Sequence, residues 1–129
     1  MNNITYTHRT ILLSIKPEFV KQIFAGTKRY EFRRRLPKEE VGKLVIYATN
    51  PVKQVMGEIK LEGLLSGTPD YIWEITKEEA GITQSRFRQY FKDTTVAYAY
   101  VLGEITVYDN PKSLQDLGIL NAPQSFVYI

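Results

Sequence analysis

The sequence predicts a single domain of the mainly β, α+β class: a five- to six-stranded pseudo-barrel of mixed or antiparallel strands with short helices at its ends. The 129 residues suit one compact domain. Several runs alternate between apolar and polar residues or are rich in β-branched residues, which is the pattern of strands. Strands and helices do not alternate regularly, and this argues against a Rossmann-like parallel sheet. We expect residues 1–9 to be an N-terminal tail and residues 10–129 to form the domain.

The first part of the chain predicts a strand, a helix and a second strand. Residues 10–15 form a β-rich apolar run, and Pro17 interrupts this strand while suiting the first turn of a helix. The helix is expected over residues 17–25, and Gly26 supplies its left-handed end. Residues 29–35 then alternate between aromatic and charged side chains, so they predict a strand with one charged face.

Further strands and short helices are expected in the rest of the chain. The expected strands cover residues 43–49, 54–65 and 95–108, with a short terminal strand from Phe126. The turn signal Asn110–Pro111 is expected to end the strand that starts near residue 95. The expected helices cover residues 68–75 and 83–91, with a single helical turn at 113–118.

The composition excludes several kinds of site. The chain has no cysteine and one histidine, so a disulfide, a thiolate metal site and a cysteine nucleophile are excluded, and a zinc site is not expected. We therefore expect neither a cofactor nor a structural metal. The sequence has no apolar run near the roughly 20 residues of a membrane-spanning helix, and its start lacks the pattern of a signal peptide. We expect a cytoplasmic protein without a membrane partner.

The basic charge is concentrated in one segment. Residues 16–35 contain seven Lys and Arg but two Glu, whereas the whole chain has a formal net charge of +3. A basic face on a nearly neutral body is typical of proteins that bind phosphate-bearing partners. The alternative is a solvated basic edge that deters strand aggregation, and we assign Arg34 and Arg35 to such an edge.

Four residues of this segment follow the pattern G-x-K-x-x-E-x-R: Gly26, Lys28, Glu31 and Arg33. Lys28 is expected to project from an exposed turn, with Glu31 and Arg33 on one strand face. A lysine, a carboxylate and a guanidinium grouped in this way can bind a phosphate and hydrogen-bond a base edge. A purely structural alternative is an ion pair between Lys28 and Glu31. For Arg33 we expect a bidentate pairing with Glu31 that preorganises an anion site.

This motif and four further blocks resemble the ASCH domain, a branch of the PUA-like superfamily of small pseudo-barrels. The blocks lie at residues 13–17, 31–35, 45–49 and 123–126, and the resemblance extends over residues 11–129. It implies a PUA-like barrel with a cleft between the barrel wall and the helix after the first strand, which in the family is proposed to bind RNA or a modified nucleobase. Some relatives are hydrolases that deacetylate N4-acetylcytidine. Their motif lysine corresponds to Lys28, but they carry a threonine where this sequence has Glu31.

The expected function is an RNA-binding or modified-nucleotide-binding module with a basic cleft around the motif. In this interpretation Lys16 and Lys28 neutralise phosphate, and Arg33 anchors a phosphate or a purine edge. Glu31 orients Arg33 or accepts a hydrogen bond from a base amino group.

The alternative is a small hydrolase that acts on a modified nucleoside, like an amidohydrolase, or on RNA, like a ribonuclease. Lys28 and Glu31 would then be the catalytic pair, with Glu31 as a general base on a water molecule. Gln124 and Ser125 lie in a loop beside a proline and are expected either to read a base edge or to cap the end of the barrel. A third alternative is a module that binds a protein partner. The sequence gives no sign of the helix groove or large apolar patch that such a module would need.

Overall fold

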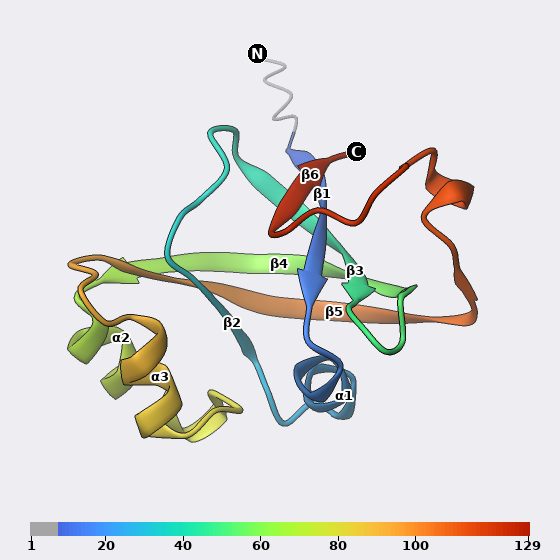
Figure 1. Ribbon diagram of the computed structural model, residues 1–129. Helices are drawn as coiled ribbons and strands as arrows, with labels where there is room; N and C mark the ends of the chain where they lie inside the picture. Colours follow the sequence, from blue (N-terminus) through green and yellow to red (C-terminus); the bar gives the residue numbers. More distant parts are fainter. Residues whose placement is uncertain (1–7) are drawn as a thin grey trace, which may run out of the picture.

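The computed structural model describes residues 8–129, so most of the expected N-terminal tail, residues 1–7, lies outside the described residues. The strands are β1 (Arg9–Ile15), β2 (Tyr30–Arg33), β3 (Val41–Ala48), β4 (Gln54–Gly67), β5 (Ala97–Lys112) and β6 (Phe126–Tyr128). They form one curled sheet in the order β2-β5-β4-β3-β1-β6 (Figure 1). Strands β1 and β3 are parallel and the other neighbours are antiparallel. The expected mixed, six-stranded barrel-like sheet is confirmed.

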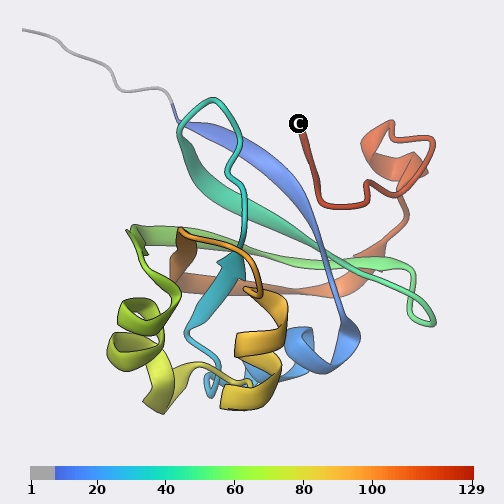
Figure 2. The ribbon, with the colours of Figure 1, turned by 60° about the vertical axis from the view of Figure 1, so that its left-hand side comes forward.

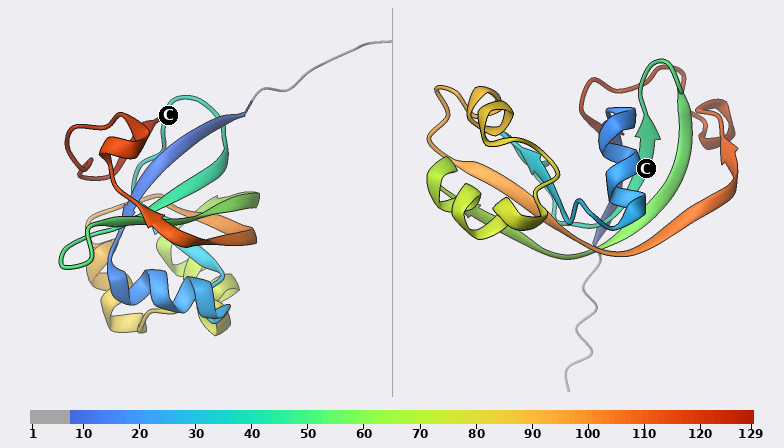
Figure 3. Two further views of the ribbon diagram at one scale, coloured as in Figure 1. Left: turned by 90° about the vertical axis from the view of Figure 1, so that its right-hand side faces the viewer. Right: turned by 90° about the horizontal axis from the view of Figure 1, so that it is seen from below.

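Short helices cover the open side and one end of this sheet. They are α1 (Pro17–Ala25), α2 (Pro69–Thr76) and α3 (Gln84–Tyr90), with 3-10 turns η1 (Lys77–Glu79) and η2 (Gln115–Leu117). Helices α2 and α3 lie together near one end of β4 and β5, and β2 runs between them and α1 (Figures 2 and 3). None of the described helices is long and apolar enough to cross a membrane.

Strand β5 separates two hydrophobic clusters. On one face, Tyr100 and Leu102 belong to the cluster inside the curled sheet, which α1 covers. On the other face, Ala97 and Ala99 belong to the cluster beneath α2 and α3, together with Phe87. Burial on both faces explains why this part of the strand is almost continuously apolar in sequence.

Strand β5 is longer than expected. The turn signal Asn110–Pro111 does not end the strand, which continues to Lys112 and pairs there with Val55 of β4. The register between the two strands shifts between Val55 and Gly57. Proline is tolerated in such an irregular stretch because the ladder does not need its missing N–H group.

Strand β1 begins one residue inside the expected tail. Strand β1 starts at Arg9, whose backbone N–H donates to the carbonyl of Glu40 at 2.9 Å. His8 packs over Gly42, where a Cβ atom would lie 2.6 Å from that of His8. The last two residues of the expected tail are therefore in contact with the sheet.

Gly26 ends α1 as expected and turns the chain toward the motif. Its φ of 83° lies in the left-handed region, which residues with a Cβ atom adopt only with strain. The N–H groups of Thr27 and Lys28 both donate to the carbonyl of Gln22, at 3.1 and 3.2 Å. These bonds close the helix and fix the backbone of Lys28 next to it.

We expect Gly26→Ala to lower the free energy of unfolding by about 1 kcal/mol, because alanine is strained at this φ. Gly63→Ala is the matched control, since a Cβ atom on Gly63 would have its nearest neighbour at an ordinary 3.9 Å. Urea unfolding of both variants measures the two changes. Equal stability of Gly26→Ala and the wild-type protein would contradict the prediction.

Candidate functional site

A cleft of about 510 Å³ lies between α1, β2, α3 and the segment before β6. This volume is in the range of small-molecule sites in proteins. The lining combines aromatic rings with basic and polar side chains: Ser14, Ile15, Lys16, Phe19, Lys28, Glu31, Phe32, Arg33, Thr49, Ile82, Arg86, Gln89, Tyr90 and Gln124. Every site residue expected from the sequence lines the cleft except Ser125, which contacts Arg33 instead.

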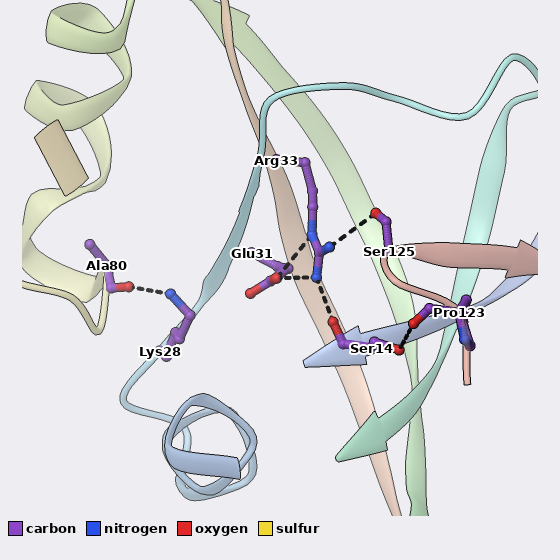
Figure 4. Close-up of polar contacts among 7 residues, drawn as sticks. All are labelled: Ser14, Lys28, Glu31, Arg33, Ala80, Pro123 and Ser125. Atoms are coloured by element: carbon purple, nitrogen blue, oxygen red, sulfur yellow. Dashed lines mark hydrogen bonds and ion pairs between the residues drawn. The ribbon is translucent and has the colours of Figure 1, made fainter. Parts of the chain in front are cut away.

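Glu31 and Arg33 of β2 pair inside the cleft (Figure 4). Nε and Nη2 of Arg33 both donate to Oε2 of Glu31, at 3.1 and 2.7 Å. The two side chains are only 14% (Arg33) and 8% (Glu31) exposed. The expected pairing on one strand face is confirmed, but both hydrogen bonds go to the same oxygen. The other carboxylate oxygen of Glu31 points to the side where Lys28 lies (Figure 4).

Arg33 also connects β2 to the opposite side of the open barrel. Its Nη2 donates to the carbonyl of Ser14, the next to last residue of β1, at 3.0 Å. Its Nη1 donates to the hydroxyl of Ser125 at 3.3 Å. Most of the guanidinium N–H groups therefore have partners within the protein.

The segment before β6 is anchored to β1 in the same place. The hydroxyl of Ser14 donates to the carbonyl of Pro123 at 2.7 Å, and the backbone N–H of Ser14 donates to the carbonyl of Ser125 at 2.9 Å. These bonds hold Gln124 at the edge of the cleft, where its side chain is exposed. Of the two roles expected for Ser125, its hydrogen bond to Arg33 fits the structural one.

Lys28 is buried, and the expectation that it projects from an exposed turn is wrong. It is 2% exposed, and its Nζ donates to the carbonyl of Ala80 at 2.7 Å. The ammonium group lies between two rings, 4.9 Å from the centroid of Phe19 and 4.8 Å from that of Phe32. Among residues 8–129, no ion pair forms between Lys28 and Glu31. The structural alternative considered for these two residues is therefore not realised.

The loop after η1 covers Lys28. A Cβ atom on Gly81 would lie 2.6 Å from the Cβ of Lys28, so glycine allows the close approach of this loop. Burial lowers the pKa of the Lys28 ammonium group below the usual lysine value, while the charge of Glu31 opposes this shift. The positive charges of Arg33 and Arg86 lower the pKa of Lys28 further.

The mouth of the cleft is formed by exposed charged residues on α1 and α3. Arg86 donates to both carboxylate oxygens of Glu18, at 2.9 and 3.2 Å, and its guanidinium carbon lies 5.1 Å from the ring centroid of Phe19. Hydrogen bonding to Arg86 lowers the pKa of Glu18. Lys16 is exposed on the same side of the cleft, immediately before α1.

The sequence interpretation did not include the cleft residues of α3. Arg86 and Tyr90 are four residues apart, so they lie on one face of the helix, and Gln89 lines the cleft beside them. Their helical spacing was a usable signal, but Glu18 of α1, which Arg86 contacts, lies 68 positions away in the sequence. Within the described part of the chain, no group of three or more His, Asp or Glu side chains is placed to hold a metal ion.

We expect replacement of Lys28 by Met to change how stability depends on pH. Because the pKa of Lys28 is lower in the folded chain than in the unfolded chain, the unfolded state binds more protons between these two values. The folded protein therefore gains stability from this group as the pH rises toward about 10.4, the ordinary lysine value. Methionine keeps an apolar chain between the two rings but does not ionise.

Urea unfolding at pH 7 and pH 10 tests this prediction. The free energy of unfolding of the wild-type protein should rise relative to that of Lys28→Met between the two pH values. Taking the difference between the two proteins cancels the titration of other groups, including Tyr100 and Tyr108. Lys92→Met, at an exposed position, is the matched control for the loss of one lysine. If the difference in unfolding free energy between the wild-type protein and Lys28→Met were the same at both pH values, the ammonium group of Lys28 would not be desolvated in the folded protein.

The chain is similar in sequence to the ASCH domain and to two named bacterial proteins. The sequence model of the ASCH domain matches residues 13–117. An ASCH domain-containing ribonuclease of Zymomonas mobilis is 39% identical over 92 residues, which cover 70% of this chain and 62% of that protein. The large ribosomal subunit protein uL22 of Ureaplasma parvum is 28% identical over 124 residues, which cover 95% of this chain and 40% of that protein. The chain thus spans less than two thirds of the length of these curated relatives.

The fold agrees with a solved structure. The crystal structure of ASCH from Zymomonas mobilis superposes with a TM-score of 0.85 and 33% sequence identity, covering 94% of this chain and 87% of that one. The same curled sheet and short helices are therefore shared over almost the whole chain. Since the ASCH sequence model also covers most of the chain, the protein belongs to the ASCH domain family.

Proposed function

We propose that this ASCH domain binds RNA and that the cleft holds one of its nucleotides. The observation that carries the proposal is the combination, in one cleft, of aromatic walls with a carboxylate–guanidinium pair. Rings bind a base face by stacking, and a fixed carboxylate can accept a hydrogen bond from a base amino group. The name of the relative from Zymomonas mobilis, a ribonuclease, supports RNA as the ligand.

The geometry suggests separate roles for the cleft residues. Phe19 and Tyr90 provide apolar surface for the base, and Glu31 presents its free carboxylate oxygen to the base edge. Lys16, exposed at the mouth, is placed to neutralise a phosphate. Arg33 is a positioning residue in this scheme, because most of its N–H groups already bind Glu31, Ser14 and Ser125.

The same cleft would accept a modified nucleotide. To identify the ligand, the purified protein is incubated with an RNA hydrolysate and with a set of modified nucleosides. Mass spectrometry then shows which compounds stay bound and which are converted. Selective retention of one modified nucleoside over the common ones would identify a modified nucleobase as the ligand, and retention of none would count against this form of the proposal.

We expect Lys16→Ala to weaken RNA binding without changing stability, because this exposed lysine contributes a phosphate contact at the mouth. Loss of one such contact should reduce the slope of log affinity against log salt concentration by about 0.7 on single strands. Fluorescence anisotropy with a labelled decaribonucleotide at several salt concentrations measures both effects. Lys92→Ala removes an equally exposed charge away from the cleft and is the matched control. If both variants lower affinity equally, the cleft is not the binding site.

A ribonuclease activity is the second candidate function. Two observations favour it: the relative named as a ribonuclease, and the free oxygen of Glu31 on the side where the buried ammonium group of Lys28 lies. Glu31 would accept a proton from the attacking hydroxyl or water as its oxygen bonds to phosphorus, and Lys28 would stabilise negative charge that develops on the phosphate. The bond from phosphorus to the 5′-oxygen of the next nucleotide would break, and this oxygen would take a proton from water.

Glu31→Gln tests this second candidate, because it keeps the shape of the side chain and removes its basicity. If Glu31 is a general base, cleavage of a labelled RNA should slow by about 10²- to 10⁴-fold while RNA binding persists. Ser125→Ala is the control, since it removes one contact of Arg33 and leaves the carboxylate intact. Equal losses in both variants would indicate that Glu31 acts only through Arg33. A wild-type protein that binds RNA and leaves it uncut would exclude the ribonuclease.

A further inference from the structure

Arg34 and Tyr90 form a second cation–aromatic pair next to the cleft. The guanidinium carbon of Arg34 lies 5.0 Å from the centroid of the Tyr90 ring. Arg34 directly follows β2 and is exposed, whereas Tyr90 ends α3, is half-buried and lines the cleft. The pair therefore joins the wall of the cleft to the solvent-exposed surface beside it.

Both members of this pair are held in place by the fold. The ring of Tyr90 meets that of Phe91 edge to face, with centroids 4.8 Å apart and planes at 74°, and Phe91 is 3% exposed. The backbone of Arg34 follows Arg33, which hydrogen bonds fix to β1 and to the segment before β6. The Tyr90 ring is thus held against a buried neighbour, and the contact with this ring is what orients the guanidinium of Arg34.

The guanidinium of Arg34 is available to a ligand. In contrast to Arg33 and Arg86, it takes part in none of the ion pairs among residues 8–129. One side of it faces a ring, and guanidinium groups stack on nucleobases as well as on aromatic side chains. Arg35 is equally charged and exposed but has no comparable ring partner in the described structure.

We propose that Arg34 and Tyr90 form a stacking platform for the nucleotide that neighbours the one in the cleft, so that the ligand is an RNA strand and not a free nucleotide. This inference rests on the proposed function of the cleft. The base of the neighbouring nucleotide stacks on the guanidinium of Arg34, and the charge of Arg34 is close to the phosphate that joins the two nucleotides. Such stacking is tolerant of sequence because every base has a planar face.

The test compares a fluorescein-labelled decaribonucleotide with the four nucleoside monophosphates as competitors. We expect Arg34→Ala to weaken decamer binding by about 5- to 150-fold, the range measured for the loss of one base-stacking partner. The inhibition constants of the monophosphates should stay unchanged, because one nucleotide fills the cleft without reaching the platform. Arg34→Lys keeps the charge and removes the planar group, so it should weaken decamer binding nearly as much as Arg34→Ala. Arg35→Ala is the matched control and should change affinity by less than about threefold, as expected for one screened surface charge.

Three results would overturn the platform while leaving the proposed function intact. The first is wild-type affinity of Arg34→Lys for the decamer. The second is an equal effect of Arg34→Ala and Arg35→Ala. The third is a wild-type protein that binds the monophosphates as tightly as the decamer. A wild-type protein that binds neither ligand would overturn the proposed function and the platform together.

Discussion

The hydrogen bonds of Arg33 determine how the open side of this barrel is closed. The sheet runs from β2, which pairs with β5, to β6 at the other edge, and among the described strands none pairs with β2 across the gap. The side chain of Arg33 spans this gap to the carbonyl of Ser14 and the hydroxyl of Ser125. Its charge is largely removed from water, and the carboxylate of Glu31 compensates it. Removing Glu31 would leave a poorly solvated cation, which generally costs more than the pair contributes.

Features that depend on short-range pattern were predictable from the sequence. The bounds of α1 follow from Pro17 and Gly26, and the twofold alternation of residues 29–35 places Glu31 and Arg33 on one face. The G-x-K-x-x-E-x-R pattern lies where α1 ends and β2 begins, and its Lys28, Glu31 and Arg33 all line the cleft. These predictions needed no knowledge of how distant segments pack.

Features that depend on distant segments were not predictable in this way. The carbonyl that accepts from Lys28 belongs to Ala80, 52 residues later in the chain, and Gly81 allows this loop to pack against the lysine. From the sequence, a lysine two residues after a helix-ending glycine is predicted to be exposed, because the loop that covers it cannot be foreseen. The contribution of α3 to the cleft was missed for the same reason. Strand β5 continues through Pro111 because its pairing with β4 is irregular there, which is a property of two strands and not of one.

The burial of charge divides the cleft into two zones with different chemistry. Inside, the charge of Arg33 is compensated by Glu31, and Lys28 is buried with its ammonium group bound to the carbonyl of Ala80. Lys16 at the mouth and Arg34 on the surface beside it are exposed, and they attract anions through a field that salt screens. In the proposed function, affinity and its salt dependence would therefore arise mainly at the mouth, and discrimination between bases would arise inside, from ring surfaces and the carboxylate of Glu31. A ligand with a phosphate chain and a base satisfies both zones at once, and this is the physical reason to favour a nucleic acid strand over a simple anion.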